Sequence, residues 1–328
     1  MQSILAITLP FFGLVLCGYL AAHSKILVES AIAGLNSFVL FFALPCMLFR
    51  FGMNTPVLDL LNPTVLLLYM LCALLIVGLT IALTWSKKIH LKDAAFGALV
   101  AAFPNSGFMG VPLLVAMLGP AAAGPTICSI LVDLFVTSSL CIALAQAHEA
   151  KRSLDANHPH PMRTVWLNAL RGPLSNPLPW AILLGILFSG FGLRLWGPID
   201  MMVRMLGDAA SPVALFTIGA VLWRARQHAH KRTPMHQVLP VALIKLLVHP
   251  LLVLVMCSFA RRLGFPLSNV QILALTLVAA LPSASNVSLL AERYGADNSR
   301  ITRIIMTSTA LAVVSFSLLA LILNVSPA

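Results

Sequence analysis

The chain has 328 residues, of which 59% are hydrophobic and only 9% are charged, and its mean hydropathy is +0.96. A soluble domain carries about 25% charged residues, so this composition excludes a soluble enzyme, a nucleic-acid-binding domain and a disordered protein. Lys and Arg exceed Asp and Glu by enough to give a net charge of +11. Because most of these basic residues lie between apolar runs, we interpret them as topology signals of a membrane protein.

Ten apolar stretches follow one another along the chain, and each is long enough to be considered as a membrane-spanning helix. They are too long and too continuously apolar to be the strands of a barrel. The sequence therefore predicts an all-α polytopic membrane protein. The predicted spans cover residues 3–22, 29–51, 64–86, 93–117, 121–147, 175–193, 199–223, 238–260, 270–291 and 300–324.

The basic residues between these spans are distributed unevenly. Odd-numbered loops contain 15 Lys and Arg residues, whereas the even-numbered loops and the termini contain 4, at Arg50, Arg194, Arg261 and Arg262. By the positive-inside rule, the odd-numbered loops lie in the cytoplasm and both termini lie outside. This bias also supports an even number of spans.

The two halves of the chain share a short motif. Residues 99–104 have the sequence LVAAFP and residues 277–282 have LVAALP, which gives five identities in six at an offset of 178. The motifs lie in the fourth span of each five-span half, and because five is odd, the second half is predicted to be inverted in the membrane. The expected units are a first repeat, 1–148, a cytoplasmic linker, 149–174, and a second repeat, 175–328.

Both motif-bearing spans contain residues that interrupt a helix. The fourth span has Pro104, Gly107, Gly110 and Pro112 within nine residues, and the ninth has Pro282 followed by small polar residues. Proline removes a backbone donor and glycine lets the chain leave helical geometry. Paired interrupted helices mark the midplane substrate sites of secondary transporters. We therefore predict that two unwound helices cross there and offer backbone N–H groups and helix N-termini to an anion.

The expected substrate-binding residues at this place comprise two side-chain donors, the prolines that hold the backbone open, and small neighbours. The alternative interpretation is that proline and glycine are simply common in membrane helices and produce kinks. The matched positions of the two motifs favour the crossing. The predicted residues are Asn105, Asn286, Pro104, Pro282, Ser106, Gly107 and Ser283.

Charged residues inside the predicted spans are the other functional candidates. Asp133 in span five is the candidate for proton coupling, with a structural hydrogen bond to a neighbouring Thr or Ser as the alternative. Lys245 in span eight either supplies a cation to a carboxylate substrate, pairs with Asp133, or extends to the nearer interface. His249 is a second coupling candidate, although a packing role is the simpler interpretation. Arg204 and Asp208 lie near the start of span seven.

Histidine and cysteine give only weak signals. Two His-x-His pairs in loops lack nearby Cys or carboxylate partners, so a metal site is not expected. The cysteines lie in apolar stretches without a CxxC pair and are expected to act as small apolar residues. No cofactor is expected. The loop histidines are His148, His158, His160, His228, His230 and His236.

Six segments carry a family resemblance, in order through most of the chain: NSFVLFFALPCMLF (36–49), FPNSGFMGVPLL (103–114), SNPLPWAILLGI (175–186), SPVALFTIGAVL (211–222), KLLVHPLL (245–252) and AALPSASNVSLLAERYG (279–295). They resemble the auxin efflux carrier family, which includes plant auxin carriers and bacterial members such as malonate transporters. The resemblance implies ten spans in two inverted five-helix repeats, a crossing at Pro104 and Pro282, and carriage of carboxylate anions. The central loop of about 25 residues resembles the bacterial members and not the long loop of the plant carriers.

The expected function is a secondary carrier that moves a small organic anion, malonate or a similar carboxylate first, across the inner (plasma) membrane by alternating access. Expected partners are the carboxylate, membrane lipid and a coupling proton or sodium ion; nucleic acid is not expected, and a homodimer is left open. An anion channel or uniporter lined by the same crossing is the alternative. A membrane-embedded enzyme is less favoured, because Pro104 stands where a G-x-S-G motif needs its first glycine and no H-E-x-x-H motif is present.

Overall fold

The computed structural model describes residues 2–153, 173–227 and 233–325. Within these ranges the chain is helical, apart from turns, short connections and one isolated backbone bridge. The predicted all-helical class is therefore confirmed. The predicted linker, 149–174, lies mostly outside the described residues, as do His158, His160, His228 and His230.

The first half of the chain contains helices joined by short turns, with three π-helical segments (η1, η2 and η4) and one 3₁₀ turn (η3). Its elements are α1 (Gln2–His23), α2 (Glu29–Phe38), η1 (Val39–Ala43), α3 (Leu44–Asn54), α4 (Val57–Leu60), α5 (Pro63–Thr84), α6 (Leu91–Ala102), η2 (Ser106–Gly110), α7 (Val111–Leu118), η3 (Pro120–Ala122), α8 (Ala123–Val132), η4 (Asp133–Thr137) and α9 (Ser138–Ser153).

The second half is built in the same way, with one π-helical segment (η5). Its elements are α11 (Pro177–Gly190), α12 (Gly197–Gln227), α13 (Met235–Leu243), η5 (Ile244–Val248), α14 (His249–Arg262), α15 (Asn269–Ala280), α16 (Asn286–Arg293) and α17 (Asn298–Ile322).

Six helical stretches in the described ranges are long and apolar enough to cross a membrane: Glu29–Asn54, Pro63–Thr84, Pro120–Ala147, Gly197–Arg224, Met235–Arg262 and Asn298–Ile322. Four shorter apolar helices cover Thr8–His23, Ser106–Leu118, Pro177–Gly190 and Asn269–Ala280. The molecule is therefore a polytopic membrane protein. Because the shorter helices do not meet the length of a span, the number ten remains a prediction.

Helix starts follow from local side-chain chemistry. The side chain of Asn62 accepts hydrogen bonds from the backbone N–H groups of Thr64 and Val65 at the start of α5. Ser268 and Gln271 form a reciprocal capping box at the start of α15. These contacts satisfy amide donors that have no partner within the helix, and they position α15 as it enters the centre of the molecule.

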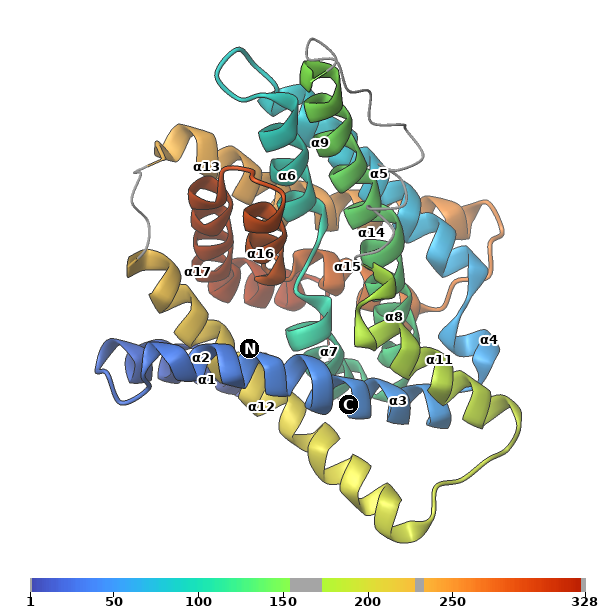
Figure 1. Ribbon diagram of the computed structural model, residues 1–328. Coiled ribbons are helices and arrows are strands. Elements are labelled where there is room, and N and C mark those ends of the chain that lie inside the picture. Colours follow the sequence, from blue (N-terminus) through green and yellow to red (C-terminus); the bar gives the residue numbers. More distant parts are fainter. Residues whose placement is uncertain (1, 154–172, 228–232, 326–328) are drawn as a thin grey trace.

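Two helix pairs approach one another closely through glycine. A Cβ atom on Gly18 of α1 would overlap the carbonyl oxygen of Phe216 in α12, and one on Gly219 of α12 would overlap that of Val15 in α1. Gly185 of α11 is packed in the same way against α3. Helices in lipid associate through such close backbone contacts, because apolar side chains gain nothing from leaving one apolar medium for another. These pairs form one side of the molecule, and the interrupted helices lie at its centre (Figure 1).

Candidate substrate-binding site at the crossing of two interrupted helices

The two interrupted helices meet through their backbones. Pro104 and Ser283 form an antiparallel bridge, in which the N–H of Asn105 donates to the carbonyl of Pro282 (2.8 Å) and the N–H of Ala284 donates to that of Phe103 (3.0 Å). The extended thread between α6 and α7 is visible at the centre of Figure 1. We call residues 103–105 and 281–284 the crossing. The predicted breaks in these two spans are both present in the structure.

Proline explains why both helices stop where they do. The residue before a proline is driven out of the α region by its ring. Phe103 accordingly has φ −95° and ψ 97°, and Leu281 has φ −62° and ψ 154°. The backbone groups freed by the break in one chain segment then pair with those of the other, which is how irregular backbone is tolerated within a membrane protein.

Four helix ends converge on the crossing. Helices α6 and α15 end there, at Ala102 and Ala280, whereas the helical turns beginning at Ser106 and Asn286 start there. Helix N-termini carry partial positive charge and helix C-termini partial negative charge. The crossing therefore offers both an attractive end for an anion and an attractive end for a cation, as in transporters with discontinuous helices.

Three polar side chains at the crossing have unused hydrogen-bonding capacity. Asn105 is only 3% exposed, and its side chain has no hydrogen-bond partner among the described residues. The hydroxyl of Ser283 and the side-chain oxygen of Asn286 are also buried without a partner in the described part of the chain. Buried polar groups are normally paired, so each exception calls for an explanation. A bound polar molecule would provide one.

The small residues of the first break have different roles. A Cβ on Gly110 would lie 3.0 Å from the Leu281 side chain and close to Ser106, so Gly110 allows the two interrupted segments to approach. A Cβ on Gly107 would meet only Leu178, at 3.9 Å. The close approach of the two interrupted segments therefore depends on Gly110, whereas the substrate-binding role of Gly107 stays a prediction.

Asp133 lies on η4 and is completely buried. Its carboxylate accepts a hydrogen bond from the Tyr69 hydroxyl (3.2 Å) and one from Thr137 (3.3 Å). The predicted bond to a neighbouring threonine is thus present, together with a partner from α5 that the sequence did not indicate. A π-helical segment redirects a side chain within a helix and is frequent at functional sites.

Lys245 lies on η5 and is also completely buried. Its ammonium donates to the carbonyl of Ala279 (2.8 Å) and lies 3.2 Å from Nδ1 of His249. It therefore does not extend to an interface. Because Ala279 is in the last turn of α15, the ammonium balances the negative end of that half-helix.

His249 lies beside the corresponding end of the other interrupted helix. Its ring is next to the backbone carbonyl of Ala101, although its Nε2 completes no well-formed hydrogen bond with a described residue. Ala101 and Ala279 occupy the same position in the LVAAFP and LVAALP motifs. One helix thus presents Lys245 to the end of α15 and His249 to the end of α6.

Asp133 and Lys245 act on one another without direct contact. Their charges interact, but no ion pair within 4 Å joins them in the described ranges. Tyr69 lies between Asp133 and His249, since its hydroxyl binds Asp133 and its ring centroid lies 6.0 Å from that of His249, which is in turn the neighbour of Lys245. The structure therefore places the predicted coupling residues around the same buried polar cluster.

The remaining predicted charges are found elsewhere. Asp208 pairs with Arg204 and also with Arg50 of α3, a partner that no local pattern indicated. Arg300, one of the 15 basic residues assigned to the odd-numbered loops, is only 1% exposed and donates to the backbone carbonyl of Asp93 at 3.0 Å. Among the described residues, no group of three or more His, Cys, Asp and Glu is placed to hold a metal ion.

These features define a membrane transporter, and comparison with known proteins names the family. Residues 3–320 match the family described as "Membrane transport protein". The chain belongs to this family, the auxin efflux carrier family, as the sequence motifs predicted.

Three relatives illustrate the range of the family. The chain is 26% identical over 317 residues to the "Putative malonate transporter" of Rhizobium meliloti (strain 1021), covering 95% of this chain and 93% of the relative. It is 24% identical over 314 residues to the "Uncharacterized transporter YfdV" of Escherichia coli (strain K12), covering 94% and 92%. It is 26% identical over 341 residues to "Auxin efflux carrier component 8" of Arabidopsis thaliana, covering 89% of each.

Proposed function

We propose that the protein is a secondary carrier of a small organic anion, malonate or a similar carboxylate, and that the anion binds at the crossing. The observation that carries this proposal is a set of polar groups, on Asn105, Ser283 and Asn286, that have no partner in the described part of the chain and lie beside two helix N-termini. The name of the Rhizobium relative supports malonate as the first candidate.

The chemistry of the crossing suits a carboxylate. An ionised carboxylate only accepts hydrogen bonds, and the Asn105 amide and the Ser283 hydroxyl are able to donate them. The N-termini at Ser106 and Asn286 add partial positive charge. Gly107 leaves room beside this backbone, while Pro104 and Pro282 keep it open. Because these donors need no reorientation, less conformational entropy is lost when the anion binds.

We propose that Asp133, Lys245 and His249 couple transport to a cation, with the proton as the first candidate and sodium as the alternative. The half-helix C-termini that face this cluster are the places where transporters of this architecture hold coupling ions. The contacts of Lys245 favour a role as a built-in counter-charge at the end of α15 over direct contact with the substrate. Protonation of Asp133 would remove its negative charge, which interacts with the charge of Lys245, and would therefore change the electrostatic potential at the two helix ends.

The proposed architecture is ten spans in two inverted five-helix repeats, 1–148 and 175–328, joined by a cytoplasmic linker, 149–174. In this arrangement the carrier lies in the inner membrane with both termini outside, and the crossing lies near the midplane, where alternating access exposes it to each side in turn. The equivalent positions of Ala101 and Ala279, each beside a side chain of the same helix, support the repeat relationship.

The substrate is testable with the purified protein. We expect malonate and related short carboxylates to raise the midpoint of thermal unfolding, because a ligand that binds only the folded state stabilises it by mass action. Counterflow in proteoliposomes should be saturable for the same compounds. Amines and neutral sugars of similar size serve as controls. Stabilisation by none of the carboxylates, or flux that rises without saturation, would contradict an anion carrier.

A further inference from the structure

A cavity lies between α3, α12 and α7, and none of the residues that line it belongs to the crossing. It has a volume of about 360 Å³, which falls within the range of small-molecule sites. Its wall combines apolar side chains with the charged groups of Arg50 and Asp208 and with polar Asn54 and Ser211. We call it the Arg50 cavity.

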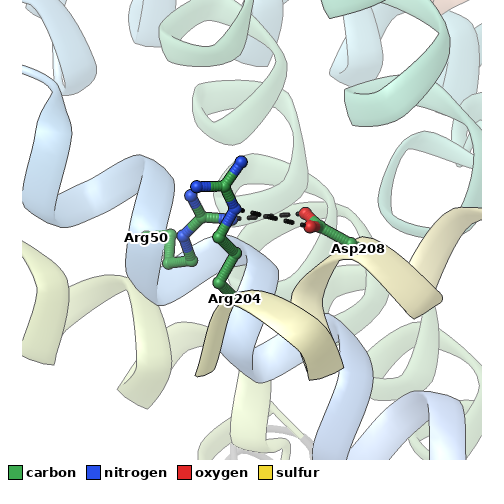
Figure 2. A network of polar contacts seen from close by, with 3 residues as sticks. All are labelled: Arg50, Arg204 and Asp208. Carbon is green, nitrogen blue, oxygen red and sulfur yellow. Dashed lines mark hydrogen bonds and ion pairs between the residues drawn. The ribbon is translucent and has the colours of Figure 1, made fainter. Parts of the chain in front are cut away.

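The charges at the Arg50 cavity do not balance. Nη1 of Arg50 lies 3.3 Å from one oxygen of Asp208, and Nε of Arg204 lies 3.8 Å from the other. Figure 2 shows both contacts converging on the single carboxylate. Two guanidinium groups therefore share one negative charge, which leaves an excess positive charge at the wall of the cavity.

Asp208 holds Arg50 only loosely. Charge-assisted hydrogen bonds to arginine are typically 2.7–2.9 Å long and often bidentate, whereas Asp208 offers Arg50 one longer contact and is its only hydrogen-bond acceptor among the described residues. The Asp208 side chain is 65% exposed and that of Arg50 is 28% exposed. Because Asp208 offers Arg50 one long contact where a bidentate pair is usual, a second carboxylate is able to compete with Asp208 for the guanidinium.

We propose that the Arg50 cavity is a second carboxylate-binding site, in which the guanidinium of Arg50 binds a small organic carboxylate and Asp208 occupies that position when the ligand is absent. The apolar side chains of Met47, Phe51 and Val115 would contact the carbon skeleton. The proposal rests on the proposed function, because it assigns the same class of ligand to this cavity.

The position of the cavity gives it a role in recruitment. Pro112 and Val115, which line it, belong to α7, the helix that continues directly from the N-terminal turn at Asn105. In the proposed topology Arg50 lies on the outer side. A carboxylate bound there would be held next to the helix that leads to the crossing.

The test uses the purified full-length protein, with malonate as the probe, in an Asn105→Ala background that weakens the crossing site. Three further changes are compared: Arg50→Gln, Asp208→Asn and, as a matched control, Arg204→Gln. Binding is measured by thermal stabilisation and by titration calorimetry. Arg50→Lys keeps the charge but not the planar fork, and it covers the case in which Arg50→Gln fails to fold.

We expect the Asn105→Ala protein to retain residual malonate binding. Adding Arg50→Gln should weaken this residual affinity at least tenfold, and Arg50→Lys should restore it in part. Adding Asp208→Asn should make the residual binding severalfold tighter. Arg204→Gln should have an effect of less than threefold. Binding that disappears with Asn105→Ala alone, or that weakens after Asp208→Asn, would overturn the second site. Because these are binding measurements, failure of the second site is distinguishable from failure of the proposed carrier, which would show as absent counterflow in the unmodified protein.

Discussion

Glycine has a different role in the helix pairs α1–α12 and α3–α11 than it has at the crossing. In the pairs, Gly18, Gly219 and Gly185 remain helical and bring two backbones into contact. At the crossing, proline and glycine interrupt the helices, and the backbones pair through hydrogen bonds between segments. The first region is held together by close backbone packing, whereas at the crossing several buried polar groups have no partner among the described residues.

This difference predicts which substitutions affect the stability of the protein and which affect its function. A region held by close packing gains nothing from a ligand and loses stability with any added volume. A region with unpaired donors and acceptors is destabilised on its own and is stabilised when a polar ligand binds. Substitutions in the first region should therefore reduce the amount of folded protein, and those in the second should change binding or coupling.

The largest effect is expected where a methyl group is added between α1 and α12. Gly18→Ala and Gly219→Ala should each destabilise the protein by at least about 1–3 kcal/mol, the usual cost of overpacking, because each Cβ would overlap a carbonyl oxygen of the other helix. The measurement is the thermal midpoint and the monodisperse fraction after solubilisation. Gly13→Ala is the control, since no atom lies within 4 Å of its Cβ. Equal behaviour of Gly18→Ala and Gly13→Ala would show that these helices are not packed as described.

Next in size is the effect of Asp133→Asn on coupling. The amide keeps an oxygen that accepts from Tyr69 or Thr137 but cannot take up and release a proton. We expect accumulation driven by a pH gradient to be lost, while counterflow exchange, which needs only binding and reorientation, remains measurable. Uptake with and without the gradient in proteoliposomes checks this. Unchanged pH-driven accumulation would remove Asp133 as the coupling group, and loss of counterflow in a folded protein would indicate a binding role instead.

A smaller effect is expected at Asn286. Its side chain is partly exposed, and Ser283 is nearer to the bridge, so Asn286→Ala should weaken substrate affinity by less than about tenfold, the ratio that corresponds to 1.4 kcal/mol. Its buried oxygen has no partner among the described residues, so its removal should not lower stability. Affinity and thermal midpoint are measured together. A loss of affinity as large as that of Asn105→Ala would show that both interrupted helices contribute equally to substrate binding, which would contradict this prediction.

The local sequence predicted the two helix breaks because the cause of each break is local. The LVAAFP and LVAALP motifs end in prolines that break helices in any context, and the structure has both breaks. The same motifs also align Asn105 with Ser283, and the bridge joins neighbouring positions. The sequence interpretation named Asn105 and Asn286 as the side-chain donors and expected the smaller effect at Asn286, and these roles stay predictions.

Contacts between distant helices were beyond the reach of local patterns. Tyr69 and Asp133 are 64 residues apart, and Arg50 and Asp208 are 158 apart. Hydropathy and spacing show which residues are costly in a membrane, but not which helix faces which. Arg300 illustrates the point: the sequence analysis counted it with the basic residues of a loop and gave no partner for it, whereas the packing of α17 against α6 and α13 buries it.

The most direct test of the account is the affinity of Asn105→Ala for malonate at matched expression, compared with the unmodified protein. Removing a hydrogen bond to a charged group costs about 1.5–3 kcal/mol, so we predict an affinity roughly ten- to a hundredfold weaker, with an unchanged thermal midpoint in the absence of ligand. Unaltered malonate affinity in a folded Asn105→Ala protein would contradict anion binding at the crossing.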